Sequence, residues 1–228
     1  MLRPTLAAAV TAGGDMNAYQ QIDADFLARF PQGLQDAEWL ALAKKHRSLD
    51  SVLKLCRDGL AEPLLRAAID SGNTAAVIDT CRQIVSRCTT VSTFEKIAFR
   101  NYLAFSDVHR PFVTALHALL YRFGEASFAD FVEVLQLCRH DDNANPAKWP
   151  LVSCFLAYSD PQRHVCIKPT TIKRLAARLG GDIGYRSLPN FATYSRVQTM
   201  VLQFRSHSVL AADQNNIIAQ AVMYCAAA

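Results

Sequence analysis

The sequence predicts an all-α fold, an irregular bundle of about ten helices. Apolar residues recur every three to four positions along most of the chain, which is the period of an α-helix. Glycine and proline are few, nine of each in 228 residues, so helices are rarely interrupted. Only residues 165–167 have an extended pattern, and so short a segment cannot build a sheet.

The first half of the chain carries clear helix boundaries. Pro63 stands in a first turn, where its missing N–H costs nothing, and Gly72 is a stop signal. Ser92 and Glu95 have the spacing of a capping box, and Gly124 separates two apolar periodic segments. The helices expected from these signals cover 37–55, 61–69, 73–88, 92–105, 112–124 and 127–138.

The clearest break is the polar segment 139–149, which contains Asn145-Pro146. It is either a loop within one continuous domain or the joint between an N-terminal helical lobe, 15–138, and a C-terminal helical lobe, 149–228. The helices expected after the break cover 149–159, 169–179, 190–204 and 215–224. Residues 1–14 are expected to form a disordered leader, because their apolar part is short for a secretory signal.

Composition indicates a globular protein of the cytoplasm. The net charge is +4. The sequence has no run of eighteen apolar residues, the length that would indicate a membrane span. The seven cysteines are odd in number and scattered, which favours reduced thiols over a disulfide framework. His164 and Cys166 are close neighbours, but two ligands do not make a zinc site. We therefore expect no metal and no cofactor.

Motifs that carry catalysis are absent from the sequence. It contains no GxSxG, Walker loop, HExxH or GxGxxG. Residues 171–181 resemble the first helix and turn of a helix-turn-helix, but Arg186 and Pro189 occupy apolar anchor positions of the second helix. The same stretch loosely resembles a segment of helical DNA glycosylases, with Lys168 and Pro169 in place of the catalytic aspartate. No catalytic residue is assigned.

A concentration of positive charge in residues 161–186 is the strongest functional signal. This basic stretch holds six Lys and Arg residues against Asp182 alone. Its predicted helix starts at Thr170-Thr171, where free N–H groups and the helix dipole attract anions. The candidate phosphate-binding residues are His164, Lys168, Thr170, Thr171, Arg174, Arg178, Tyr185 and Asn190. The alternative is a capped helix with an ordinary solvated basic face.

A wider resemblance covers nearly the whole chain. It rests on residues 26–31, 101–104, 149–152, Pro161, His164, 168–169, 179–180, Tyr185, 189–190 and 193–194. In these positions the chain resembles a family of uncharacterised bacterial all-helical proteins. The resemblance implies a helical fold and a bacterial source, and it brings no known activity. Residues 218–224 depart from the polar helix that the family has near its end.

A binding protein is the function that these observations favour. The first expectation is nucleic-acid binding, by contact of the basic stretch with the phosphate backbone. The alternative is a protein-interaction or regulatory module in which the same stretch docks an acidic partner. An enzyme acting on a phosphorylated or nucleotide substrate is the third possibility.

Overall fold

The all-α prediction is confirmed. The computed structural model describes residues 17–44, 48–137 and 145–226, and these contain twelve α-helices and no strand. The α-helices are α2 (Ala18–Arg29), α3 (Ala37–Lys44), α4 (Ser48–Gly59), α5 (Glu62–Ser71), α6 (Ala75–Arg87), α7 (Thr93–Tyr102), α8 (His109–Tyr121), α9 (Glu125–Val134), α10 (Trp149–Ser159), α11 (Pro169–Arg178), α12 (Phe191–His207) and α13 (Asn216–Ala226). Two 3₁₀ turns, η1 (Gly33–Gln35) and η2 (Ser106–Val108), join neighbouring helices.

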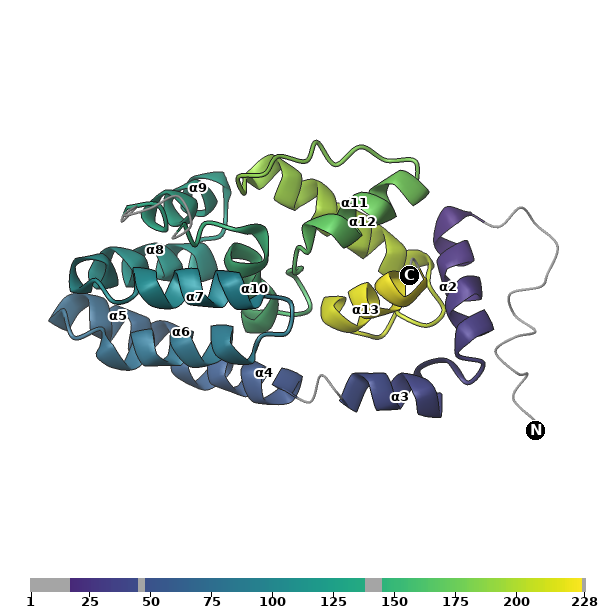
Figure 1. Ribbon diagram of the computed structural model, residues 1–228, viewed down its shortest axis with the longest axis horizontal. Helices are drawn as coiled ribbons and strands as arrows, with labels where there is room; N and C mark the ends of the chain where they lie inside the picture. Colours follow the sequence, from purple (N-terminus) through teal and green to yellow (C-terminus); the bar gives the residue numbers. More distant parts are fainter. Residues whose placement is uncertain (1–16, 45–47, 138–144, 227–228) are drawn as a thin grey trace.

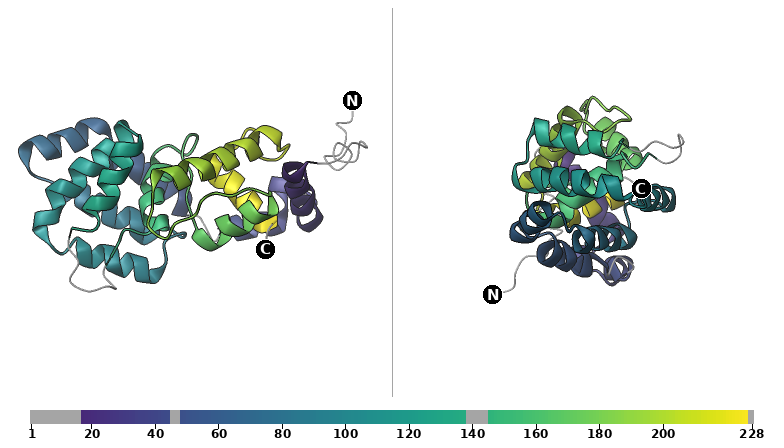
Figure 2. Two further views of the ribbon diagram at one scale, coloured as in Figure 1. Left: turned by 90° about the horizontal axis from the view of Figure 1, so that it is seen from above. Right: turned by 90° about the vertical axis from the view of Figure 1, so that its left-hand side faces the viewer.

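The helices form two groups on either side of α10 (Figures 1 and 2). Helices α4 to α9 pack together in one half, through pairs such as α4 with α6 and α8 with α9. Helices α2, α3 and α11 to α13 occupy the other half. Helix α10 contacts both α4 and α8 and is buried from Trp149 to Tyr158, as expected for a helix that is apolar on all sides.

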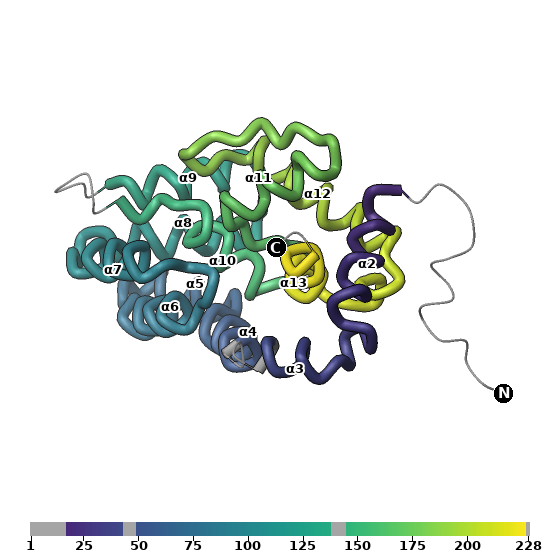
Figure 3. The backbone as a smooth tube through the Cα atoms, turned by 45° about the vertical axis from the view of Figure 1, so that its right-hand side comes forward, coloured from purple at the N-terminus to yellow at the C-terminus, as the bar shows by residue number. Residues whose placement is uncertain are grey.

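The two ends of the described chain meet. Helix α2 packs against α13 and also touches α12 (Figure 3). One core of buried apolar residues extends from Ile22 in α2 to Met223 in α13. The division into lobes 15–138 and 149–228 stays a prediction, and this packing joins residues from both sides of it. The leader predicted at 1–14 and residues 139–144 of the predicted break lie outside the described residues.

Local signals in the sequence act as expected. Ser92 Oγ accepts a hydrogen bond from the Glu95 N–H, and Glu95 Oε2 accepts one from the Ser92 N–H. Pro63 lies in the first turn of α5, and Gly72 follows its last residue with a φ of 75°, in the left-handed region that favours glycine. These residues fix where the helices start and stop.

An aromatic cluster occupies the core where α10 meets α7, α8 and α9. Phe155 is completely buried, and its ring centroid lies 6.0 Å from that of Phe99, 6.1 Å from Phe112 and 6.0 Å from Phe131. Ring pairs at these separations contribute beyond their buried area. The cluster therefore ties α10 to the helices of the first half.

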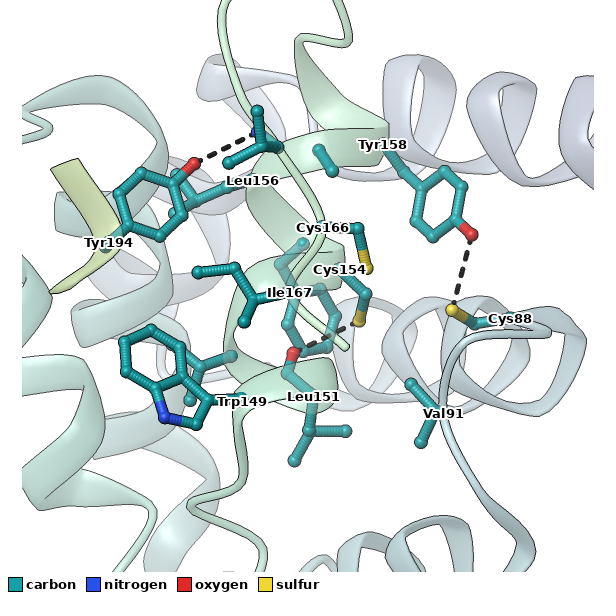
Figure 4. Packing of buried hydrophobic residues seen from close by; sticks show 14 of the residues in the cluster. Cys88, Val91, Trp149, Leu151, Cys154, Leu156, Tyr158, Cys166, Ile167 and Tyr194 are labelled. Carbon is teal, nitrogen blue, oxygen red and sulfur yellow. Dashed lines mark hydrogen bonds between the residues drawn. The ribbon is translucent and has the colours of Figure 1, made fainter. Parts of the chain in front are cut away.

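Most of the cysteines belong to the core. The six described cysteines are free thiols, and five of them are buried: Cys56, Cys81, Cys88, Cys154 and Cys166. Figure 4 shows Cys154 and Cys166 among the apolar side chains around α10, with Cys88 facing Tyr158. Burial raises the pKa of Cys166 to about 12, so this thiol is protonated at neutral pH. The seventh cysteine, Cys138, lies outside the described residues.

Candidate phosphate-binding surface

The extended segment before α11 is part of the core. Residues 164–167 are buried, although they form neither helix nor strand. Side chains therefore satisfy their backbone groups, as buried N–H and C=O groups require. The Val165 N–H donates to the Tyr194 hydroxyl at 3.2 Å, and the Ile167 N–H donates to Ser153 Oγ at 2.8 Å.

Two polar side chains of α13 complete this arrangement. Gln220 Oε1 accepts from the Cys166 N–H at 3.0 Å, and Gln220 Nε2 donates to the Cys166 carbonyl at 2.6 Å. Asn216 Nδ2 donates to the carbonyls of Gln162 and His164, both at 3.1 Å. The segment is thus held by α10, α12 and α13, and most of it has no access to a ligand.

His164 shares this buried environment. Its side chain is 4% exposed, its Nδ1 lies 3.1 Å from the Tyr194 hydroxyl, and the Phe123 ring packs edge-on at 4.5 Å between centroids. Burial lowers the pKa of His164 to about 4; the Asp160 charge opposes this shift and the Arg163 charge adds to it. The neutral ring is a packing element, and the surface role expected for His164 has no support in its position.

This buried histidine predicts a stability that depends on pH. Below its ordinary pKa of about 6.5 the unfolded state takes up a proton, whereas the folded state stays neutral down to about pH 4. Between about pH 7.5 and pH 5, the free energy of unfolding should therefore fall by about 2 kcal/mol more than in the His164→Gln variant. Urea melts of both proteins measure the difference, and equal pH dependences would contradict the assignment.

Two further candidates hold the fold together. The Arg178 guanidinium forms an ion pair with Asp25 of α2 and donates to the Ala226 carbonyl of α13 at 2.6 Å. Asn190 is the N-cap of α12: its Oδ1 accepts from the Thr193 N–H at 3.0 Å, and its Nδ2 donates to the Leu188 carbonyl at 3.2 Å. Arg178 and Asn190 therefore already have structural partners, and neither the Arg178 guanidinium nor the Asn190 amide is free to bind an anion.

Other candidates lie on the exposed side of α11. Lys168 and Thr170 are exposed at the start of this helix, and Arg174 is exposed one turn later. Thr171 is half-buried, and Leu175 is completely buried in the apolar stripe on the opposite face of the helix. Lys168 is the N-cap residue and its side chain makes no cap hydrogen bond. The N-terminus of α11 is therefore open to an external acceptor.

Two cations from different helices contact the loop between α11 and α12. Lys173 Nζ of α11 lies 4.8 Å from the centroid of the half-buried Tyr185 ring. The Arg196 guanidinium of α12 lies against Gly184, so close that a Cβ at that position would collide with Arg196 Nη1. Gly184 has a φ of 56°, in the left-handed region. Lys173 and Arg196, from two different helices, thus contact adjacent residues of this loop.

The same loop is fixed at both sides. The buried Trp149 of α10 donates from Nε1 to the Arg186 carbonyl at 2.7 Å, and Thr193 Oγ1 donates to the Gly184 carbonyl at 2.8 Å. Arg186 itself is exposed. We define the basic surface as five exposed cations: Lys168, Lys173, Arg174, Arg186 and Arg196.

The positive charge of the basic surface is largely uncompensated. Within the described part of the chain, none of the cations of the basic surface forms an ion pair. Asp182 lies on the same loop and accepts from the Gly184 N–H at 2.7 Å. Residues 145–228 contain nine Lys and Arg against three Asp and Glu, whereas residues 1–144 contain fifteen against seventeen. Positive charge is therefore concentrated in the C-terminal part.

The sequence did not indicate that Lys173 and Arg196 contact the loop between α11 and α12. Lys173 is one of the counted charges of the basic stretch, but Arg196 lies outside it, in the middle of a helix. The polar pair Asn216 and Gln220 did carry a signal, because two amide side chains one turn apart in an apolar helix need buried partners.

Comparisons with known proteins do not assign the chain to a family. No protein-family model matches the chain, and neither a curated protein nor a solved structure matches it significantly. The resemblance to bacterial all-helical proteins therefore rests on the residues given above. Over the ranges that the structure describes, no helix is both long and apolar enough to cross a membrane, and no three His, Cys, Asp or Glu side chains are grouped to hold a metal ion.

Proposed function

We propose that the protein binds nucleic acid by contact of its basic surface with the phosphate backbone. The observation that carries this proposal is that Lys173 and Arg196 contact the adjacent residues 184–185, while neither forms an ion pair within the described part of the chain. Like charges repel, and a polyanion that neutralises both releases its own counterions, which favours binding. The free thiols of the described cysteines are consistent with a cytoplasmic location.

The start of α11 extends this surface. A phosphate at the open N-terminus would meet the first-turn N–H groups and the positive end of the helix dipole. Lys168 lies just before this point, and Arg174 follows Thr170 by four residues on the same helix face. Because these groups recognise phosphate, we expect binding with little dependence on base sequence.

Fluorescence anisotropy with labelled duplex and single-stranded oligonucleotides, in a salt series, tests the proposal. The variant Lys173→Ala/Arg174→Ala/Arg196→Ala should bind more weakly, and its slope of log K against log salt should fall by up to about 0.9 per lost contact on duplex DNA. Arg178 is kept because it pairs with Asp25.

A matched control removes three exposed cations from the other half of the molecule: Arg87→Ala/Arg110→Ala/Arg122→Ala. The net charge changes equally, and binding should stay close to wild type. If wild type does not bind at low salt, where the electrostatic contribution is largest, the proposal is wrong. Equal losses in the two variants would indicate attraction by net charge without a defined site.

A further inference from the structure

A groove between α6 and α7 is the second unexplained feature of the surface. Its volume is about 300 Å³, at the lower end of the range for ligand pockets. The apolar part of the lining comes from Val85, Ile97 and Phe99. Phe94 lies one turn before Ile97 on α7, and its side chain is 84% exposed. An exposed aromatic ring beside an apolar groove is typical of a protein-docking site.

Three cations also line the groove. Arg82 is fixed by Asp79 and by the Leu103 carbonyl, each at 2.9 Å. Lys96 Nζ donates to the Ser86 carbonyl at 2.8 Å. Arg100 is exposed, and as far as the structure describes the chain, neither it nor Lys96 forms an ion pair. The groove thus combines apolar surface with a net positive charge.

The outer side of α9 and the residues after it have the complementary chemistry. We define the α9 ridge as its exposed residues Glu125, Ala126, Ala129, Asp130, Glu133 and Leu137. Among the described residues, the three carboxylates of this ridge form no ion pair with Lys or Arg. Leu137 is 56% exposed, and the two alanines leave room for close approach of another chain.

We propose that the α6–α7 groove binds the α9 ridge of a second copy of this chain. A helix laid in a groove is a common recognition mode, with apolar side chains as anchors and charges setting the orientation. Leu137 contacts the apolar surface formed by Phe94 and Ile97, while the ridge carboxylates face Lys96 and Arg100. Nucleic acid fits the groove less well, because much of its lining is apolar and two of its three cations already donate to protein groups.

Each copy carries both the groove and the ridge. Two copies can therefore satisfy both contacts in a two-fold dimer, or each copy can bind the next in a head-to-tail chain. A single helix–groove contact is smaller than a standard stable interface, so association is weak and depends on protein concentration. It also weakens with salt, because exposed charges contribute to it.

Sedimentation equilibrium of the whole protein, from the micromolar to the millimolar range, measures this association. Lys96→Glu/Arg100→Glu should weaken it about tenfold or more, and Asp130→Lys/Glu133→Lys should do the same. Mixing the two variants should restore association between them, since opposite charges then face each other again. Arg100→Glu alone provides a second groove variant if the double substitution lowers stability in thermal melts.

The variant Lys173→Ala/Arg174→Ala/Arg196→Ala is the control, because it removes three positive charges away from the groove. It should associate like wild type even if nucleic-acid binding is lost, so the two proposals can fail separately. A wild-type protein that stays monomeric over the whole range would overturn the inference. So would charge-reversed variants that associate like wild type, or a mixture that associates no better than either variant alone.

Discussion

The Phe155→Ala variant should lose about 3–5 kcal/mol of unfolding free energy, because the substitution opens a cavity in the aromatic cluster of the core. Phe155 is completely buried in α10 and touches the rings of Phe99, Phe112 and Phe131. Since α10 lies between the two halves, the cavity also weakens the contact that joins them. Denaturant melts followed by circular dichroism measure the change.

Phe94→Ala provides the matched control. The same atoms are removed from a side chain that is 84% exposed, so the change should stay within about 0.5 kcal/mol. The comparison is made at low protein concentration, where the proposed self-association is negligible. A similar loss in both variants would contradict the central position of Phe155 in the core.

Gln220→Leu should cost about 2–4 kcal/mol, the second-largest expected effect. Leucine fits the volume of glutamine but leaves the buried Cys166 N–H without an acceptor. The Cys166 carbonyl keeps one weaker donor, the Tyr224 hydroxyl at 3.4 Å. The loss comes from burying unpaired polar groups, since the apolar surface of the side chain is retained.

Gln83→Leu is the control for this substitution. Gln83 is exposed on α6, so leucine there should change the unfolding free energy by no more than about 0.5 kcal/mol. If Gln220→Leu lowered the unfolding free energy as little as Gln83→Leu, the hydrogen bonds from α13 would not be needed to hold the extended segment. The thermal unfolding of both variants can be compared in one buffer.

Local signals were sufficient to predict the fold class and many helix boundaries. The Ser92–Glu95 capping box and the glycine after α5 act over a few residues, so their effect can be recognised without tertiary structure. The burial of Leu175 follows in the same way from the apolar stripe of α11. The packing of α2 on α13 could not be predicted, because no local pattern specifies contacts between distant helices.

Candidate site residues were harder to assign for the same reason. Arg178 has the pattern of a free surface cation, but its partner Asp25 is 153 residues away in the sequence. His164 lies in a polar stretch, and its burial depends on Tyr194 and Phe123 from other elements. Lys168, Thr170 and Arg174 have the exposure that the sequence suggested, because α11 lies with one face on the surface.

The packing of α2 on α13 also affects how the nascent chain reaches its native state. Roughly 200 residues separate the two helices, so at about 5–20 residues per second the ribosome needs roughly 10–40 s to supply the partner of α2. Helices α4 to α9 can pack locally during that time, while α2 lacks its partner α13. Such a delay makes α2 a natural early client for a chaperone, and it places closure of the α2–α13 contact at the end of folding.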